Sequence, residues 1–227
     1  MKLKFVVLLL TVSAMFSTVL GQGRPRGGEP GGLFSSPVLP KSDREKAILA
    51  VLEDMDRNQR PGSLSVPMED GRILRLLTES SGATNVVEIG TSIGYSSIWF
   101  CLALEKTGGK LTTFEIDAGR ASQARENFKR AGVDKLVTQV LGDAHEKVKQ
   151  LKDPIDILFL DADKEGYADY LNQLLPRVRP GGLIIAHNMN PRQADPRYLK
   201  AITTQPELET LFLNLERSGI GVSMKKR

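Results

Sequence analysis

A strand that leads into a glycine-rich turn and then into a helix constrains the fold of this chain more than any other feature. The largely apolar residues 86–89 are followed by Gly90 and Gly94, and Tyr95 begins a stretch with helical periodicity. Glycine lets the backbone approach a ligand closely, and the free N–H groups at a helix start point toward that ligand. The junction therefore predicts an α/β fold that binds a nucleotide-type cofactor at the turn.

The spacing of the glycines narrows the choice of cofactor. Gly90 and Gly94 form a G-x-x-x-G pattern, whereas dinucleotide-binding proteins carry G-x-G-x-x-G. Glu88, which precedes the first glycine by two positions, would repel a pyrophosphate and suits a cationic or amine-bearing ligand such as S-adenosylmethionine (SAM). A nicotinamide-dependent reductase is therefore the least favoured enzyme class.

Beyond position 40, helical and strand patterns alternate along the chain. A capping box from Ser42 to Glu45 opens the first helix. Further helices are predicted at 68–80, 95–104, 118–131, 145–151 and 166–178. Strands are predicted at 85–89, 110–114, 136–140, 155–160, 182–186, 208–213 and 220–224. Apolar strands that alternate with helices predict a doubly wound, mostly parallel seven-stranded sheet with helices on both faces, and the last two strands predict a C-terminal antiparallel hairpin.

The first 40 residues differ from the rest. Lys2 and Lys4 precede an apolar run at 5–20, which is the layout of a secretory signal peptide with cleavage after Gly21. The run is short for a membrane span, although an uncleaved anchor stays open as an alternative. A Gly/Pro-rich linker follows at 22–40, which leaves 41–227 as one domain. We therefore expect a protein that is exported (secreted or periplasmic) or held at a membrane by its N-terminal segment.

The composition favours a small-molecule ligand over a nucleic acid. The 227 residues contain 31 Lys and Arg against 27 Asp and Glu, without a basic stripe interleaved with aromatic residues. Cys101 is the single cysteine, so the chain forms no intrachain disulfide. The sequence is compatible with a homodimer.

Polar residues follow the ends of the predicted parallel strands. In an open sheet of this kind, ligands bind outside the carboxyl ends of the strands, so these residues are expected to form one site. They are Glu88 with the glycine turn, Glu115, the run 142–144, the run 161–164, and His187 with Asn188. Glu115, which ends the second strand, is well placed to accept hydrogen bonds from ribose hydroxyls.

Several of these segments match motifs of one enzyme family. The motifs are the turn at 87–96, Phe114-Glu115-Ile116-Asp117, Gly142-Asp143-Ala144, Phe159-Leu160-Asp161-Ala162-Asp163-Lys164 with Tyr167, and Gly181-Gly182-Leu183 leading to Asn188. Over residues 66–226 the chain resembles the metal-dependent small-molecule O-methyltransferases, the group of the catechol and caffeoyl-CoA enzymes. The Asp-Ala-Asp-Lys-x-x-Tyr motif carries most of this resemblance, because many methyltransferases share the glycine turn.

The resemblance implies a SAM-dependent, class I methyltransferase that methylates a small hydroxylated, catechol-like acceptor. The implied SAM-binding residues are Glu88, Gly90, Ser96, Glu115, Ala144 and Asp163. Asp161 and Asn188 take the positions of metal ligands, and Lys164 takes the position of the general base. Oxygen ligands of this kind suit Mg²⁺, and the metal would acidify a bound hydroxyl before the lysine removes its proton.

His187 departs from the family pattern, which has Asp-Asn where this chain has His187-Asn188. An imidazole ligand favours Mn²⁺ or Zn²⁺ over Mg²⁺, so either the metal has changed or the site binds none. His187 is thus either a third metal ligand or a polar strand-end residue, and His145 is expected at the surface or as a helix cap. This departure also motivates an alternative function, a degenerate methyltransferase fold that binds an adenosyl ligand or a partner without turnover.

Overall fold

The computed structural model describes residues 36–213 and 218–227. The chain divides into two compact units, Met1–Leu39 and Pro40–Arg227, and the described helices and strands all belong to the second unit. The predicted export segment and most of the predicted linker lie outside the described residues. Within the described part of the chain, no helix is both long enough and apolar enough to cross a membrane.

One sheet of seven strands organises the second unit, in the order β3-β2-β1-β4-β5-β7-β6. The strands are β1 (Asn85–Ile89), β2 (Lys110–Glu115), β3 (Val137–Leu141), β4 (Ile155–Leu160), β5 (Val178–His187), β6 (Leu208–Leu213) and β7 (Ile220–Lys225). The first five are parallel, and β7 runs antiparallel to both β5 and β6. The predicted doubly wound sheet with its C-terminal antiparallel hairpin is confirmed.

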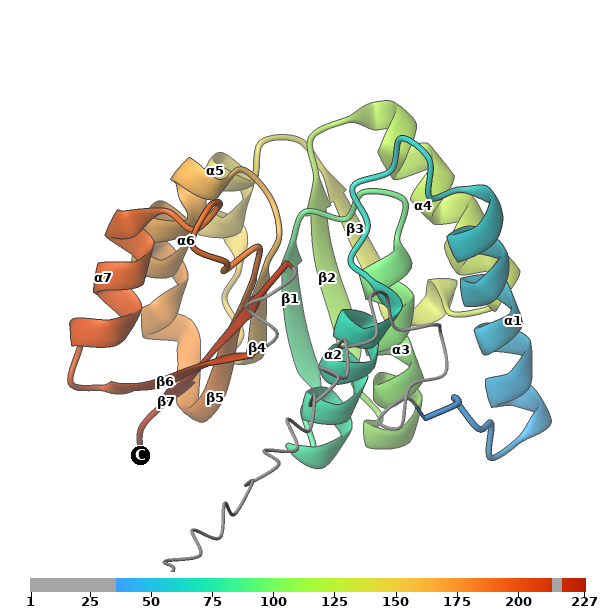
Figure 1. The fold of residues 1–227 in the computed structure, drawn as a ribbon, viewed down its shortest axis with the longest axis horizontal. Helices are drawn as coiled ribbons and strands as arrows, with labels where there is room; N and C mark the ends of the chain where they lie inside the picture. Colours follow the sequence, from blue (N-terminus) through green and yellow to red (C-terminus); the bar gives the residue numbers. More distant parts are fainter. Residues whose placement is uncertain (1–35, 214–217) are drawn as a thin grey trace, which may run out of the picture. The chain divides into compact units, whose positions relative to one another are not determined.

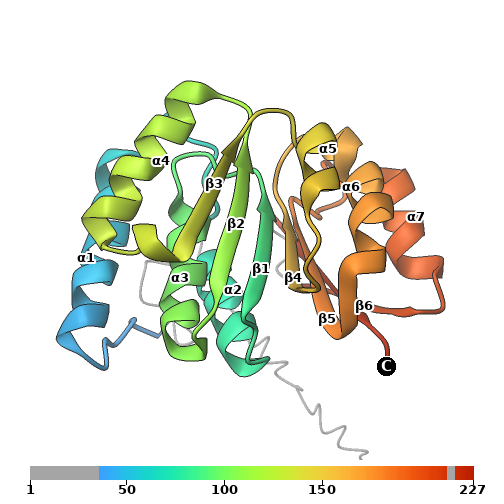
Figure 2. The same cartoon turned by 180° about the vertical axis from the view of Figure 1, so that it is seen from behind.

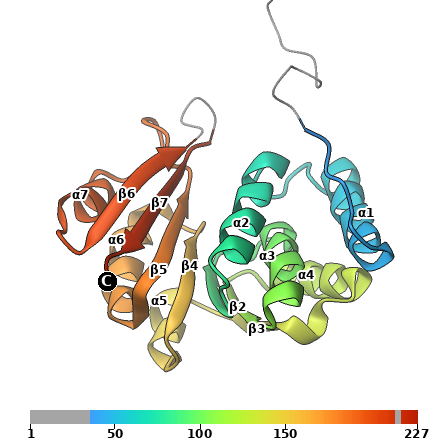
Figure 3. The same ribbon diagram turned by 90° about the horizontal axis from the view of Figure 1, so that it is seen from below.

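Helices cover both faces of this sheet (Figures 1 and 2). They are α1 (Asp43–Asn58), α2 (Met68–Ser80), α3 (Tyr95–Thr107), α4 (Ala118–Ala131), α5 (Ala144–Lys147), α6 (Tyr167–Leu174) and α7 (Pro196–Thr204). The first four lie on one side of the sheet and α5, α6 and α7 lie on the other, as Figure 3 shows along the sheet. Because both faces are covered, most residues of β1 and β4 are buried and apolar.

The alternation of side chains along β5 decides where its last residue points. Ile184 and Ala186 belong to the apolar core that also contains Tyr167 of α6 and Tyr198 of α7. Successive side chains of a strand point to opposite faces, so His187 is directed to the other side of the sheet. There its ring contacts Asp70 in the first turn of α2.

The structure shortens two predicted helices and adds one that is not predicted. The helix predicted at 166–178 is α6 followed by a 3₁₀ turn, Leu175–Arg177, and Val178 already belongs to β5. The helix predicted at 145–151 is a short α5 followed by a 3₁₀ turn, Val148–Gln150. Helix α7 is not predicted at all, although its sequence carries a start signal: Asp195 caps the helix by accepting a hydrogen bond from the Arg197 N–H, and Pro196 stands at the first helical position.

Candidate functional site

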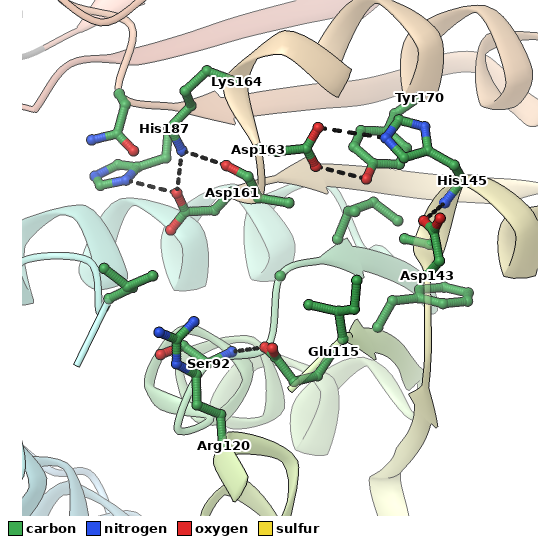
Figure 4. A pocket seen from close by; sticks show the side chains of 18 of the residues that line it. Ser92, Glu115, Arg120, Asp143, His145, Asp161, Asp163, Lys164, Tyr170 and His187 are labelled. Carbon is green, nitrogen blue, oxygen red and sulfur yellow. Dashed lines mark hydrogen bonds and ion pairs between the residues drawn. The ribbon is translucent and has the colours of Figure 1, made fainter. Parts of the chain in front are cut away.

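A cavity of about 790 Å³ lies at the carboxyl ends of the parallel strands (Figure 4). It opens between the neighbouring strands β1 and β4. The strand order reverses here, because the chain runs from β1 outward to β3 and then crosses to β4 on the other side of β1. Ligands of doubly wound folds bind at such a point. The strand-end residues that line it include Ile89, Gly90, Glu115, Gly142, Asp161, His187 and Asn188.

The glycine turn after β1 forms one wall of the cavity. Gly90 has φ 101° and Gly94, the N-cap of α3, has φ 86°, a backbone conformation that favours glycine. A Cβ on Gly90 would lie 2.3 Å from the backbone oxygen of Asp161. The first glycine is therefore required because the turn packs directly against the end of β4.

Glu88 and Ser96 lie beneath this turn rather than in the cavity. The Glu88 side chain is fully buried and accepts hydrogen bonds from the hydroxyls of Ser96, Ser97 and Thr113. Burial raises the pKa of Glu88 to about 7, although the three hydroxyl donors act to lower it. The geometry thus gives Glu88 the role of tying β1 to β2 and to the first turn of α3.

Glu115 presents a fixed carboxylate to the cavity. Its Oε2 atom accepts a hydrogen bond of 2.7 Å from the Ser92 N–H, and its Oε1 atom accepts one of 3.0 Å from the Asp117 N–H. Ser92 is held at φ 48°, and its buried hydroxyl has no hydrogen-bond partner among the described residues. Two backbone donors leave further lone pairs of Glu115 free to accept hydrogen bonds from a ligand.

A second cluster lies on the α5–α6 side of the cavity. Asp163 accepts a hydrogen bond of 2.9 Å from the Tyr170 hydroxyl. The ring of His145 stacks on Tyr170 at 4.2 Å between centroids, and its Nδ1 atom lies 2.5 Å from a carboxylate oxygen of Asp169. Burial acts to lower the pKa of His145, but the hydrogen bonds to Asp169 and Asp163 outweigh it and raise the pKa. His145 lines the cavity with Ala144, so the prediction of a mere surface or capping residue is incomplete.

Lys164 lies near the end of β4 with all three of its donors used. Its Nζ atom donates to Asp161 Oδ1 at 3.1 Å, to the Ala162 carbonyl at 2.9 Å and to the Tyr167 hydroxyl at 2.8 Å. Three acceptors around one nitrogen match the ammonium form of the side chain. Figure 4 shows Lys164 and His187 converging on the carboxylate of Asp161.

His187 is enclosed by two carboxylates. Its Nδ1 atom lies 3.2 Å from Asp161 Oδ1, and its Nε2 atom lies 3.0 Å from Asp70 Oδ2. Burial acts to lower the pKa of His187, but the hydrogen bonds to Asp161 and Asp70 outweigh it and raise the pKa to about 9. The ring is therefore an imidazolium at neutral pH, with both nitrogens occupied.

Comparison with known proteins places this site in a family. The model of the O-methyltransferase family matches residues 40–191, which include the glycine turn, Glu115, Asp161, Lys164 and His187. The chain belongs to the O-methyltransferase family. A catechol O-methyltransferase of Niastella koreensis is 36% identical to it over 169 residues, which are 73% of this chain and 74% of that protein.

Solved O-methyltransferases share the fold and hold the cofactor. The enzyme from Bacillus cereus, in complex with SAH, matches with a TM-score of 0.67 and 28% identity over 83% of this chain and 93% of that chain. TomG from Streptomyces achromogenes, in complex with SAM, matches with a TM-score of 0.68 and 26% identity over 84% of this chain and 93% of that chain. These structures support SAM as the cofactor of this O-methyltransferase.

The structure gathers most of the predicted site residues of this O-methyltransferase around one cavity. Those that line it are Gly90, Glu115, Ala144, Asp161, Asp163, Lys164, His187 and Asn188. His145 and Tyr170 also line the cavity and Asp70 is a partner of His187, although none of the three is a predicted site residue. His145 follows the end of β3, and ligands of such sheets bind at the carboxyl ends of the strands, so its position in the sequence does indicate a cavity residue. Asp70 lies 117 positions from His187 and carries no local signal.

Proposed function

We propose that this O-methyltransferase transfers the methyl group of SAM to a small hydroxylated, catechol-like acceptor. The observation that carries the proposal is the different character of the two parts of one cavity. Glu115 and the glycine turn offer hydrogen-bond acceptors and close backbone approach, whereas Asp161, Lys164 and His187 form a cluster of charges. The name of the Niastella relative supports a catechol-like acceptor.

The first part of the cavity suits SAM. The lone pairs of Glu115 that the backbone leaves free would accept hydrogen bonds from the ribose hydroxyls. Gly90 allows the methionine part to approach the turn, and Ala144 lies beside the place proposed for the adenine. Asp163, held by Tyr170, is a further proposed contact to the cofactor.

The charged cluster suits the reacting hydroxyl. In the transfer, the acceptor oxygen forms a bond to the methyl carbon, the bond from that carbon to the SAM sulfur breaks with its electron pair staying on sulfur, and the hydroxyl proton passes to solvent water. The Lys164 ammonium and the His187 imidazolium would lower the pKa of a hydroxyl bound beside them and stabilise the developing oxyanion. Lys164, the proposed catalytic residue, would act as this electrostatic group, since its nitrogen donates hydrogen bonds to three acceptors.

The divalent metal that the resemblance implies fits these residues poorly. A metal ligand needs a free lone pair, and both ring nitrogens of His187 are directed at carboxylates. Asp161 Oδ1 is shared by Lys164 and His187, and among the described residues no group of three His, Cys, Asp or Glu side chains is arranged to hold a metal ion. No step of the proposed reaction is therefore routed through a metal.

A second candidate function is cofactor binding without turnover. The observation in its favour is the pairing of Asp161 with both Lys164 and His187, which already satisfies the charge of this carboxylate. Binding of SAM without release of SAH in the presence of a broad set of hydroxylated acceptors would favour this candidate.

Calorimetry and an isotope assay together test the proposed function. The purified full chain is titrated with SAM and with SAH, and then incubated with methyl-labelled SAM and a panel of catechols. We expect both ligands to bind and the label to appear on an acceptor oxygen. Absence of SAM binding would contradict the proposal.

The expected export or anchoring of the protein by residues 1–21 is a separate proposal, which rests on the sequence alone.

A further inference from the structure

The ring of His187 bridges two carboxylates that come from opposite parts of the fold. Asp161 follows β4, whereas Asp70 belongs to the first turn of α2. Asp70 is fully buried, the His187 side chain is 6% exposed and the Asp161 side chain is 11% exposed, so the bridge is largely shielded from water. Opposite charges that are shielded from water attract each other more strongly than those at the surface.

Hydrogen-bond chemistry fixes the form of this bridge. Ionised carboxylates only accept hydrogen bonds, so an imidazole placed between two of them must donate from both nitrogens. Asp70 Oδ2 also accepts a hydrogen bond of 2.5 Å from the Ser218 hydroxyl, which makes this oxygen an acceptor twice. The ring is therefore a cation held by geometry, with no lone pair left on it.

The charges of the cluster balance without a metal ion. Asp161 and Asp70 contribute two negative charges, and His187 and Lys164 contribute two positive charges. A divalent cation could reach Asp161 Oδ1 only by displacing Lys164 or His187. The displaced side chain would lose its carboxylate partner, and the net charge of the buried cluster, which includes Asp70, would change. The arrangement thus opposes a metal ion at Asp161 Oδ1 on both steric and electrostatic grounds.

We infer that His187, fixed between Asp161 and Asp70, supplies the positive charge of the acceptor site in place of a divalent metal ion, and that the acceptor is bound through a single hydroxyl group. This inference rests on the proposed function and deepens it. A metal ion binds a vicinal pair of hydroxyls by chelation, which needs open coordination positions. A fixed positive charge offers no coordination positions, so the site has no requirement for a second, adjacent hydroxyl.

Metal binding by the full chain tests the inference without an activity measurement. Titration with Mn²⁺, followed by electron paramagnetic resonance, is compared between the parent and Asp161→Asn. We expect the two to bind Mn²⁺ alike, and the SAM dissociation constant of the parent to agree within about twofold in excess chelator and in Mg²⁺. One equivalent of Mn²⁺ bound by the parent and lost in Asp161→Asn would overturn the inference.

Replacement of His187 tests the inference in the opposite direction, by a gain of Mn²⁺ affinity. His187→Asp replaces the cation by a carboxylate and should raise Mn²⁺ affinity by at least about tenfold, a gain that the added Asp161→Asn change should remove. His145→Gln, a neutral change of the other histidine that lines the cavity, should leave Mn²⁺ affinity at the parent level. If His187→Asp proves unfolded by circular dichroism, the parent titration above still decides the question. A folded His187→Asp that binds Mn²⁺ no better than the parent would overturn the inference.

Acceptor choice separates this inference from the proposed function. Catechol and resorcinol carry the same two hydroxyls, adjacent in the first and separated in the second. With the full chain in excess chelator, we expect methyl transfer to both. Transfer that occurs only with added metal, or to catechol but not to resorcinol, would overturn the inference while the proposed function stands. A protein that binds no SAM would instead contradict the proposed function, whatever its behaviour toward Mn²⁺.

Discussion

Gly90 lies directly against the backbone of Asp161, so that a Cβ at this glycine would lie 2.3 Å from the Asp161 oxygen. This contact joins the turn that follows β1 to the strand end that carries the charged cluster. The parallel pairing of β1 with β4 holds the two segments side by side. A change at Gly90 should therefore disturb both the SAM part and the acceptor part of the cavity.

Gly90→Val should weaken SAM binding by at least about tenfold. The side chain would clash with Asp161, and the residue would be strained at φ 101°. Gly108→Val is the matched control, because Gly108 also has a positive φ of 74° but has nothing within 4 Å of its Cβ position. Calorimetric titration with SAH measures both variants. Equal SAH affinity of Gly90→Val and the parent would place the cofactor elsewhere.

Glu115→Gln should weaken SAM binding by about tenfold to a hundredfold, because the amide loses the charge and one of the acceptor positions proposed for the ribose. Glu126→Gln, an exposed change on α4, serves as the control. The dissociation constant of SAH reports the effect. If Glu115→Gln binds SAH as the parent does, Glu115 has a structural role only, through its hydrogen bonds to the N–H groups of Ser92 and Asp117.

Much of this site could be predicted from the sequence by one rule, that ligands of a parallel sheet bind at the carboxyl ends of its strands. The order of apolar strands and helices predicts that Glu115, Asp161 and His187 share one edge of the sheet, and the structure brings them to one cavity. The rule does not say which face of a strand a side chain occupies. Glu88 points toward α3 because its strand neighbours Val87 and Ile89 fill the core on the opposite face, and a prediction from strand position alone cannot distinguish the two directions.

Contacts between distant segments are the part that sequence reasoning could not supply. Asp70 occupies the first turn of α2 like many acidic residues, and only the packing of α2 against the sheet places it against His187. The stacking of His145 on Tyr170 likewise depends on how α5 packs beside α6. Helix α7 is a different case, because the sequence itself carries its start signal in Asp195 and Pro196.

The stability of the fold should depend on pH through Glu88. Its pKa is raised from 4.5 to about 7, so the folded state favours the protonated carboxyl, and the stability that this proton supplies is present below pH 4.5 and lost as the pH rises through 7. Over this range the free energy of unfolding of the parent should fall by about 1 to 3 kcal/mol more than that of Glu88→Gln. Urea denaturation at intervals between the two pH values measures this, with Glu126→Gln as the exposed control. Parallel curves for the parent and Glu88→Gln would contradict the buried, titrating carboxyl.

Processing of the N-terminus tests the export proposal. If residues 1–21 are a signal peptide, mass spectrometry of the native protein should find a mature chain that begins near Gln22. An intact Met1 in the membrane fraction would indicate an anchor instead. Intact protein in the soluble cytosolic fraction would contradict both versions.

The most direct test of the account is to separate SAM binding from methyl transfer in Lys164→Met. Lys164 lies in the charged cluster, away from the Glu115 carboxylate and the Ser92 N–H, and its loss removes an ammonium from the acceptor site. We expect the SAH dissociation constant to stay within about threefold of the parent value, while kcat with labelled SAM and a hydroxylated acceptor falls by at least about a hundredfold. Undiminished methyl transfer by Lys164→Met would contradict the assignment of this cluster as the place where the acceptor hydroxyl reacts.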